Sequence, residues 1–228
     1  PEPGYIPLEL ATAYMNLEMA DKAEPLAQAF LQKHPRSIRG HEILCEILWE
    51  QGGTDRALAL LDACAEETAQ SVPILALRGE ALFRAGRLKE AEKLYSSAMK
   101  TWGRHEVLTR GLARLWDHQG KKEKARNLYG EILAGCATCG SRGDPFAKRR
   151  FADLSLELGD QSTRVLELYL SLIREDPAGK VRYYQKISRI YEQQGYREEA
   201  DRYREFARRA GAEADGAPGD DENRENSL

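Results

Sequence analysis

The stretch that decides the fold reads VPILALRGEALFRAGRLKEAEKLYSSAMK and covers residues 72–100. Apolar residues recur every three or four positions on both sides of Ala85-Gly86-Arg87, which is the spacing of two short amphipathic helices. Gly86 favours a helix end, because glycine reaches positive φ without a steric penalty. The stretch therefore predicts a helical hairpin.

This hairpin recurs along the chain with a fixed period. Alanines stand at four positions that are each 34 residues apart: Ala23, Ala57, Ala91 and Ala125. Glycines keep the same step at Gly52, Gly86 and Gly120, and so do Tyr95 and Tyr129. Three residue types in one phase predict tandem repeats that stack on their neighbours.

The period and the pattern resemble the tetratricopeptide repeat family. The resemblance is clearest where the family places large, small, large, turn-glycine, small, aromatic and small residues, here Leu75, Gly79, Leu82, Gly86, Ala91, Tyr95 and Ala98. It covers roughly residues 4–210. It implies an all-α fold, a right-handed superhelical solenoid of about six helix-turn-helix repeats.

The repeat phase gives a domain division. We place repeats near residues 4–37, 38–71, 72–105, 106–139, 145–179 and 181–211, which together make a repeat domain over residues 1–211. The segment GCATCGSRGD at 135–144 shifts the phase between the fourth and fifth repeats. Residues 212–228 show high charge density without apolar periodicity, so we expect a disordered acidic tail.

The charge balance excludes some classes of partner. The chain has a net charge of -3, and the acidic tail contributes -5 of it, which leaves a body of +2. A nearly neutral body argues against nucleic-acid binding. The apolar runs are also far shorter than the roughly 20 residues of a membrane span, so we expect no membrane insertion within this stretch.

The family resemblance also indicates where a partner would bind. In this family the first helix of each hairpin lines the concave wall of the superhelix. We place eight candidate partner-binding residues there: Met15, Trp49, Phe83, Arg110, Arg114, Arg149, Arg182 and Arg189. Buried aromatic residues are frequent binding hot spots, and arginine forks suit carboxylates. We expect a protein or peptide partner with apolar and acidic segments, bound extended or as a helix; the alternative is a solvated face of intramolecular ion pairs.

These features favour a protein-interaction scaffold or adaptor that is not an enzyme, because no catalytic set of residues converges and no cofactor motif is present. The alternative is the repeat region of a larger membrane-tethered assembly or secretion factor, of exopolysaccharide or lipopolysaccharide type, or the regulatory region of an enzyme. Self-association is compatible with either role. A further hypothesis is that the acidic tail folds back onto the arginine-rich part of the groove and competes with the partner.

The cysteines bear on metal binding and on compartment. Cys136 and Cys139 form the only motif with intrinsic chemistry, and a zinc half-site, a redox pair and a plain loop all fit it. One pair lacks two further ligands, so we expect no metal, with these two residues the only candidates. Cys45 and Cys64 are interpreted as small packing residues that face each other, or as a disulfide in an oxidising compartment. The cytoplasm is favoured, and a periplasmic location fits a trimmed N-terminus, since the chain begins at Pro1 without Met.

Overall fold

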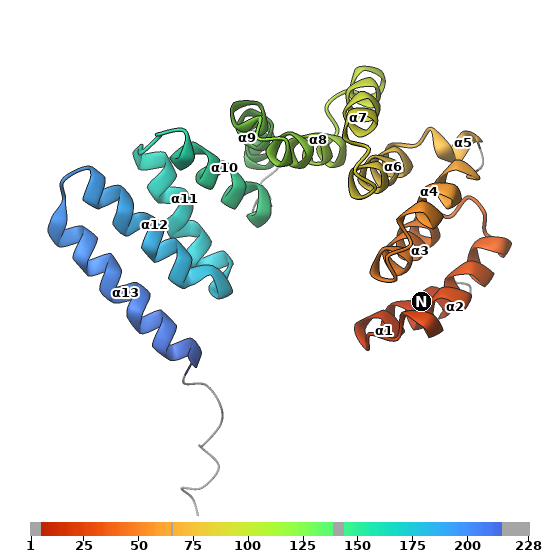
Figure 1. The fold of residues 1–228 in the computed structure, drawn as a ribbon, viewed down its shortest axis with the longest axis horizontal. Helices are drawn as coiled ribbons and strands as arrows, with labels where there is room; N and C mark the ends of the chain where they lie inside the picture. Colours follow the sequence, from red (N-terminus) through yellow and green to blue (C-terminus); the bar gives the residue numbers. More distant parts are fainter. Residues whose placement is uncertain (1–5, 65, 139–143, 216–228) are drawn as a thin grey trace, which may run out of the picture. The chain divides into compact units, whose positions relative to one another are not determined.

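The computed structural model describes residues 6–64, 66–138 and 144–215, in which it contains helices and turns but no strand. The predicted all-α repeat fold is confirmed (Figure 1). Within the described residues, twelve longer helices follow one another as six pairs: α1 (Ile6–Asn16) and α2 (Ala20–Lys33), α3 (Ile38–Glu50) and α4 (Thr54–Asp62), α6 (Val72–Arg84) and α7 (Leu88–Trp102), α8 (Glu106–His118) and α9 (Lys122–Thr138), α10 (Pro145–Glu157) and α11 (Thr163–Glu175), α12 (Lys180–Gln193) and α13 (Arg197–Asp215). Two short elements, α5 (Glu66–Ala69) and the 3-10 turn η2 (Pro177–Gly179), lie between pairs.

The chain divides into two compact units, Pro1–Leu128 (unit 1) and Tyr129–Leu228 (unit 2), and each is described by itself. The division falls inside α9, so the last part of that helix belongs to unit 2.

Glycines at the predicted turn positions end the first helix of a pair. Gly86 has φ 73°, and the N–H of the following Arg87 donates to the carbonyl of Leu82 at 2.9 Å. This bond satisfies a carbonyl that the helix end leaves open. In the first hairpin the same turn is made by Glu18 at φ 58°, where a residue with a Cβ costs roughly 1 kcal/mol or more.

Small residues at the predicted packing positions let a large ring enter between hairpins. The four periodic alanines are fully buried. In unit 1 the ring of Tyr95 lies against two backbones, because a Cβ on Gly79 of α6 or on Gly111 of α8 would overlap it. The Tyr95 hydroxyl donates to the carbonyl of Ala76 at 3.3 Å. One tyrosine from α7 thus ties its own hairpin to the next.

Unit 2 has a core of the same kind, built from α10, α11 and α12. Tyr169, Leu172, Tyr183 and Ile187 are fully buried in it. A second aromatic layer joins α12 to α13, in which the rings of Tyr191 and Tyr203 stack with centroids 5.5 Å apart. Stacked aromatic rings therefore help to hold the last hairpin together.

The helix ends correct one predicted boundary. Helix α13 continues to Asp215, so the acidic tail does not begin at 212. Ala212, Glu213 and Ala214 are good helix formers and prolong the amphipathic helix before them. The rest of the predicted tail, residues 216–228, and its proposed fold-back lie outside the described residues. The predicted repeat limits remain predictions.

Candidate partner-binding face

The first helices of unit 1 form a closely packed row. Helices α1, α3, α6 and α8 each contact the next one, whereas the described second helices α2, α4 and α7 make few or no contacts with one another. Helices that pack more closely lie on the inner side of a curved stack. The row of first helices is therefore the concave face of unit 1.

Six side chains from three of these helices form a continuous group, here called the concave cluster: Trp49 of α3, Glu80, Phe83 and Arg84 of α6, and Arg114 and His118 of α8. The guanidinium carbon of Arg84 lies 4.6 Å from the centroid of the Trp49 ring. That of Arg114 lies 5.7 Å from the Phe83 ring, whose edge-to-face contact with His118 has a centroid distance of 5.1 Å. Cation–π and aromatic contacts thus cross both helix junctions.

Glu80 joins the two arginines of the concave cluster. Nε of Arg84 donates to its Oε1 at 2.9 Å, and Nη1 of Arg114 donates to its Oε2 at 2.9 Å. The Glu80 side chain is 16% exposed, whereas those of Arg84 and Arg114 are 45% and 38% exposed. Two arginines share one carboxylate, so these three side chains together have a formal charge of +1. That charge faces solvent.

The indole of Trp49 contains an unsatisfied donor. Its Nε1 is buried and has no hydrogen-bond partner among the described residues. A buried polar group without a partner costs about 1–3 kcal/mol. An acceptor placed at Nε1 would remove this cost.

The α3 edge of the face has the opposite charge. Glu42, Glu46 and Glu50 follow one another at helical spacing along α3. Burial raises the pKa of the Glu46 carboxyl above its usual value; Arg39 counteracts this shift, while the charges of Glu42 and Glu50 add to it. The concave face is therefore acidic on α3 and positive at Arg84 and Arg114.

Three of the eight predicted binding residues, Trp49, Phe83 and Arg114, belong to the concave cluster. The other two in unit 1 lie outside it. Met15 is half-buried on α1, and Arg110 pairs with Glu106 of its own helix.

The remaining three predicted arginines lie in unit 2. The guanidinium carbon of Arg149 lies 5.4 Å from the centroid of the Phe146 ring, and its Nη1 lies 4.0 Å from Oδ2 of Asp176. Arg182 lies over the ring of Tyr183 with a distance of 5.3 Å, and Arg189 is exposed. Arg149 and Arg182 thus make contacts within the fold, as the alternative of a solvated face with intramolecular ion pairs expects of such residues.

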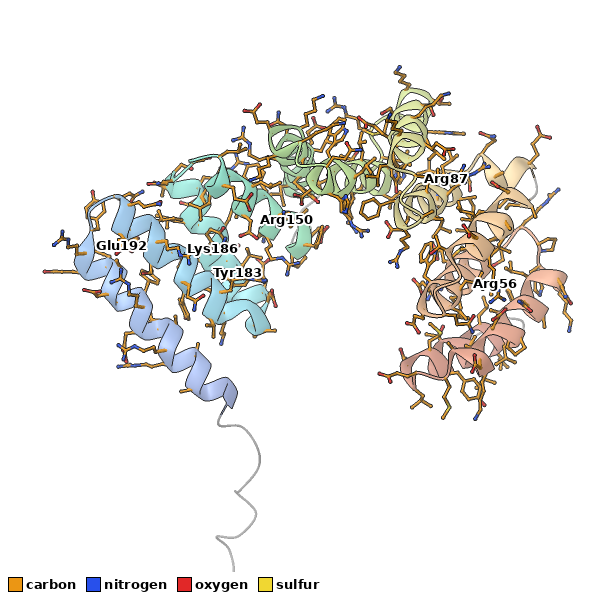
Figure 2. All side chains as sticks on the ribbon, in the orientation of Figure 1. Arg56, Arg87, Arg150, Tyr183, Lys186 and Glu192 are labelled. Carbon is orange, nitrogen blue, oxygen red and sulfur yellow. The ribbon has the colours of Figure 1, made fainter. Side chains whose placement is uncertain are left out.

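Unit 2 also contains a nearly buried carboxylate, Asp153 of α10, which is 9% exposed. Its Oδ1 accepts a hydrogen bond from the Tyr169 hydroxyl at 2.8 Å. The charged nitrogens of Arg150 and Lys186, both labelled in Figure 2, each lie 3.7 Å from one of its oxygens. Burial, followed by the charge of Asp153, raises the pKa of Tyr169. This network links α10, α11 and α12 and has a structural role.

Glu80, Arg84 and His118 are not among the eight predicted residues, although counting along the repeat places all three on the same wall. A signal for them exists in the repeat spacing. Glu80 and Arg114 are 34 residues apart, so opposite charges occupy the same position in adjacent repeats. Trp49 and Arg84 are 35 residues apart, as are Phe83 and His118. The contact between an aromatic ring and the side chain 35 residues later is thus made twice.

Two further searches gave negative results for the described residues. Within 6–64, 66–138 and 144–215, no group of three or more His, Cys, Asp or Glu side chains is placed to hold a metal ion. No described helix is both long and apolar enough to cross a membrane. The predicted Cys136–Cys139 motif falls outside the described side chains.

Comparison with known proteins identifies the family. The family model described as "Tetratricopeptide repeat" matches residues 48–101, which include Trp49, Glu80, Phe83 and Arg84. This chain is a tetratricopeptide repeat protein. Proteins with this fold are typically non-catalytic. No curated protein sequence matches the chain.

Several solved structures share the fold of this tetratricopeptide repeat protein. BtubC from P. vanneervenii is 17% identical, with a TM-score of 0.69 over 92% of this chain and 94% of its own. PilF of Pseudomonas aeruginosa is 16% identical, with a TM-score of 0.67 over 88% of both chains. A thermophilic TPR protein of Thermus thermophilus is 19% identical, with a TM-score of 0.63 over 81% of this chain and 98% of its own. At these identities the likeness shows the fold alone.

Proposed function

We propose that this protein is an interaction scaffold or adaptor, and that the concave cluster of unit 1 binds a segment of a partner protein. The observation that carries the proposal is the pair of exposed arginines, Arg84 and Arg114, which share the single carboxylate of Glu80 beside two aromatic rings. The partner segment has an acidic side chain for the arginines and an apolar side chain for the rings of Trp49 and Phe83.

The ion pairs within the cluster prepare it for such a partner. Glu80 holds both guanidinium groups in place, so a partner carboxylate meets side chains that have already lost part of their rotamer freedom. Arginine remains able to pair with a second carboxylate because its planar group has five donors. A partner oxygen that reaches the indole also supplies the acceptor that Nε1 of Trp49 lacks.

The charge division of the face sets the orientation of the segment. The three glutamates of α3 repel an acidic side chain, whereas Arg114 on α8 attracts it. The acidic part of the partner therefore lies toward α6 and α8, and a basic or neutral part lies over α3.

Selection of random twelve-residue peptides displayed on phage tests this proposal. Peptides retained by the wild-type protein should combine an aromatic residue or leucine with Asp or Glu. Their affinity should fall at least tenfold in a variant with Arg84→Gln and Arg114→Gln, because each lost charge-assisted bond is worth about 1.5 kcal/mol or more.

The matched control removes two positive charges from α7 of the same unit, through Lys89→Gln and Lys93→Gln. Both lysines are exposed on a second helix. The control should change the affinity less than twofold. Equal losses in the two variants would mean that the peptides respond to net charge and not to the concave cluster. The alternative roles in a larger assembly, secretion factor or enzyme rest on the resemblance alone and stay predictions.

A further inference from the structure

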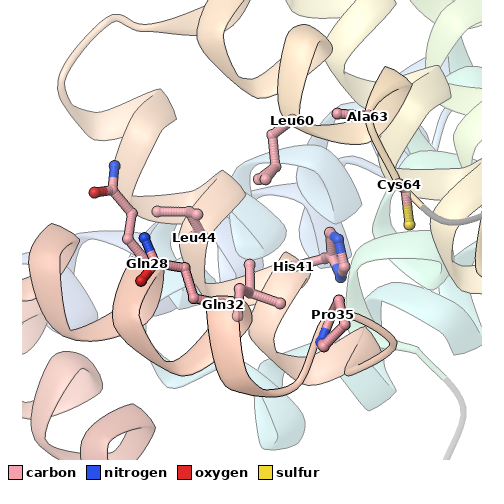
Figure 3. A pocket seen from close by; sticks show the side chains of 9 residues that line it. Gln28, Gln32, Pro35, His41, Leu44, Leu60, Ala63 and Cys64 are labelled. Carbon is pink, nitrogen blue, oxygen red and sulfur yellow. The ribbon is translucent and has the colours of Figure 1, made fainter.

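A pocket of about 320 Å³ lies in unit 1 between α2, α3 and α4, away from the concave cluster (Figure 3). Leucines from each of the three helices line it: Leu31, Leu44 and Leu60. Helix α4 has nine residues, against 14 in α2 and 15 in α7, so the chain leaves the helix at Ala63 before it can fill this space. The size and the mostly apolar walls, to which Gln28 and Gln32 also contribute, are those of a small-molecule site.

His41 lines the pocket and has one ring nitrogen, Nε2, for which the described residues supply no donor. The residue is 3% exposed, and its Nδ1 lies 2.8 Å from the carbonyl oxygen of Ser37. A carbonyl can only accept, so Nδ1 carries the hydrogen and donates it. In the neutral ring Nε2 is then an acceptor, and no described residue donates to it. An acceptor at the wall of a mostly apolar pocket suits a ligand with a donor.

The pocket favours a neutral ligand. None of the nine described residues that line it is Lys, Arg, Asp or Glu. A cavity of about 410 Å³ nearby is different, because its walls carry the ion pairs Arg78–Asp62 and Arg87–Glu90. Burying an unpaired ligand charge among leucines would cost several kcal/mol. The ligand therefore carries its polarity as a hydroxyl group and not as a charge.

From these observations we infer that the pocket is a binding site for a small neutral molecule with a compact apolar body and one hydroxyl group. The body lies among Leu31, Leu44 and Leu60, and the hydroxyl donates to Nε2 of His41. This site is independent of the partner-binding face, because none of its lining residues belongs to the concave cluster.

The test compares 4-butylphenol with 4-butylanisole, its methyl ether, which has the same apolar body and no donor. Binding is measured by calorimetry at pH 8, where histidine is ordinarily neutral. The phenol should bind at least tenfold more tightly than the ether, and His41→Phe should reduce that ratio to less than threefold. Equal affinities for the wild-type protein would overturn the assignment of Nε2 as the acceptor.

Two further variants keep the test decisive if His41→Phe fails to fold. Leu60 is half-buried, and Leu60→Trp should fill the pocket and abolish phenol binding. The control Leu94→Trp adds the same bulk at the neighbouring cavity and should leave the affinity within twofold. Phenol binding that survives Leu60→Trp would place the molecule elsewhere and refute the proposal.

Cys64 offers a readout of position, since it lines the same pocket. Saturating phenol should slow its alkylation by iodoacetamide at least fivefold. Unchanged alkylation contradicts the site. If N-acetyl-leucinamide protects Cys64 and the phenol does not, the pocket receives a side chain of a protein partner and the proposal is wrong.

Discussion

Replacing Gly111 with alanine tests the packing that holds the first helices in a row. The added Cβ would lie 2.5 Å from Cε1 and Cζ of Tyr95 and 2.6 Å from its hydroxyl oxygen. The ring cannot retreat, because its other side rests on the backbone at Gly79. Overpacking of this kind costs about 1–3 kcal/mol, while alanine in a helix gains back up to about 1 kcal/mol over glycine. We expect Gly111→Ala to lower the free energy of unfolding by about 1–2 kcal/mol.

Urea unfolding followed by tryptophan fluorescence measures this loss in the right unit, since Trp49, Trp102 and Trp116 all lie in unit 1. The loss should shrink when Tyr95→Leu is combined with Gly111→Ala, because the smaller side chain leaves room for the Cβ. The control is Gly135→Ala in α9, where a Cβ meets nothing within 4 Å. Followed by circular dichroism, it should stabilise the protein by up to about 1 kcal/mol. Gly111→Ala with wild-type or higher stability would refute the close approach of Tyr95 and α8.

Three further predictions concern single groups. Lys148→Ala should destabilise unit 2 by about 2–3 kcal/mol in urea titrations, because the lysine donates to both oxygens of the half-buried Glu175 at 2.7 and 2.6 Å; a loss below about 0.5 kcal/mol would argue against this pair. A hydrogen bond from Trp116 lowers the pKa of the Glu92 carboxyl. The bond therefore stabilises the fold fully above the usual glutamate pKa of about 4.3. This stability is lost as the pH falls through the lowered pKa. Glu92→Gln should therefore flatten the pH dependence of unfolding between about pH 5 and 3, and an unchanged slope contradicts the assignment. Burial raises the pKa of the Cys45 thiol to about 12, so peptide mapping after iodoacetamide at pH 8 should find Cys45 unmodified until urea unfolds the protein.

The fold could be predicted because its determinants are local and periodic. A buried alanine every 34 residues from Ala23 to Ala125, and a turn glycine at φ of 72° or 73° in the second to fourth hairpins, give the same hairpin whatever the surface carries. The tail boundary could not be predicted in the same way. Ala212 and Ala214 show no apolar period, yet the helix before them continues through them on backbone propensity.

The make-up of the concave cluster could be predicted in part. Counting along the repeat placed Trp49, Phe83 and Arg114 on first helices, and these three lie together in the concave cluster. Counting did not show which arginines would be partnered within the fold. Arg149, for example, lies over the ring of Phe146. This contact depends on side-chain directions, which a 34-residue step does not encode. The pocket at His41 was also missed, because it arises from the early end of α4 and not from a motif.

The most direct test of partner binding at the concave cluster is the indole N–H signal of Trp49 in a nitrogen–proton correlation spectrum. The three tryptophans give three such signals, which Trp49→Phe and Trp102→Phe assign. Adding a phage-selected peptide should shift the Trp49 signal, since its Nε1 gains an acceptor, and should leave that of Trp102 on α7 in place. A shift of the Trp102 signal with that of Trp49 unmoved would place the partner on another surface and contradict the proposed function.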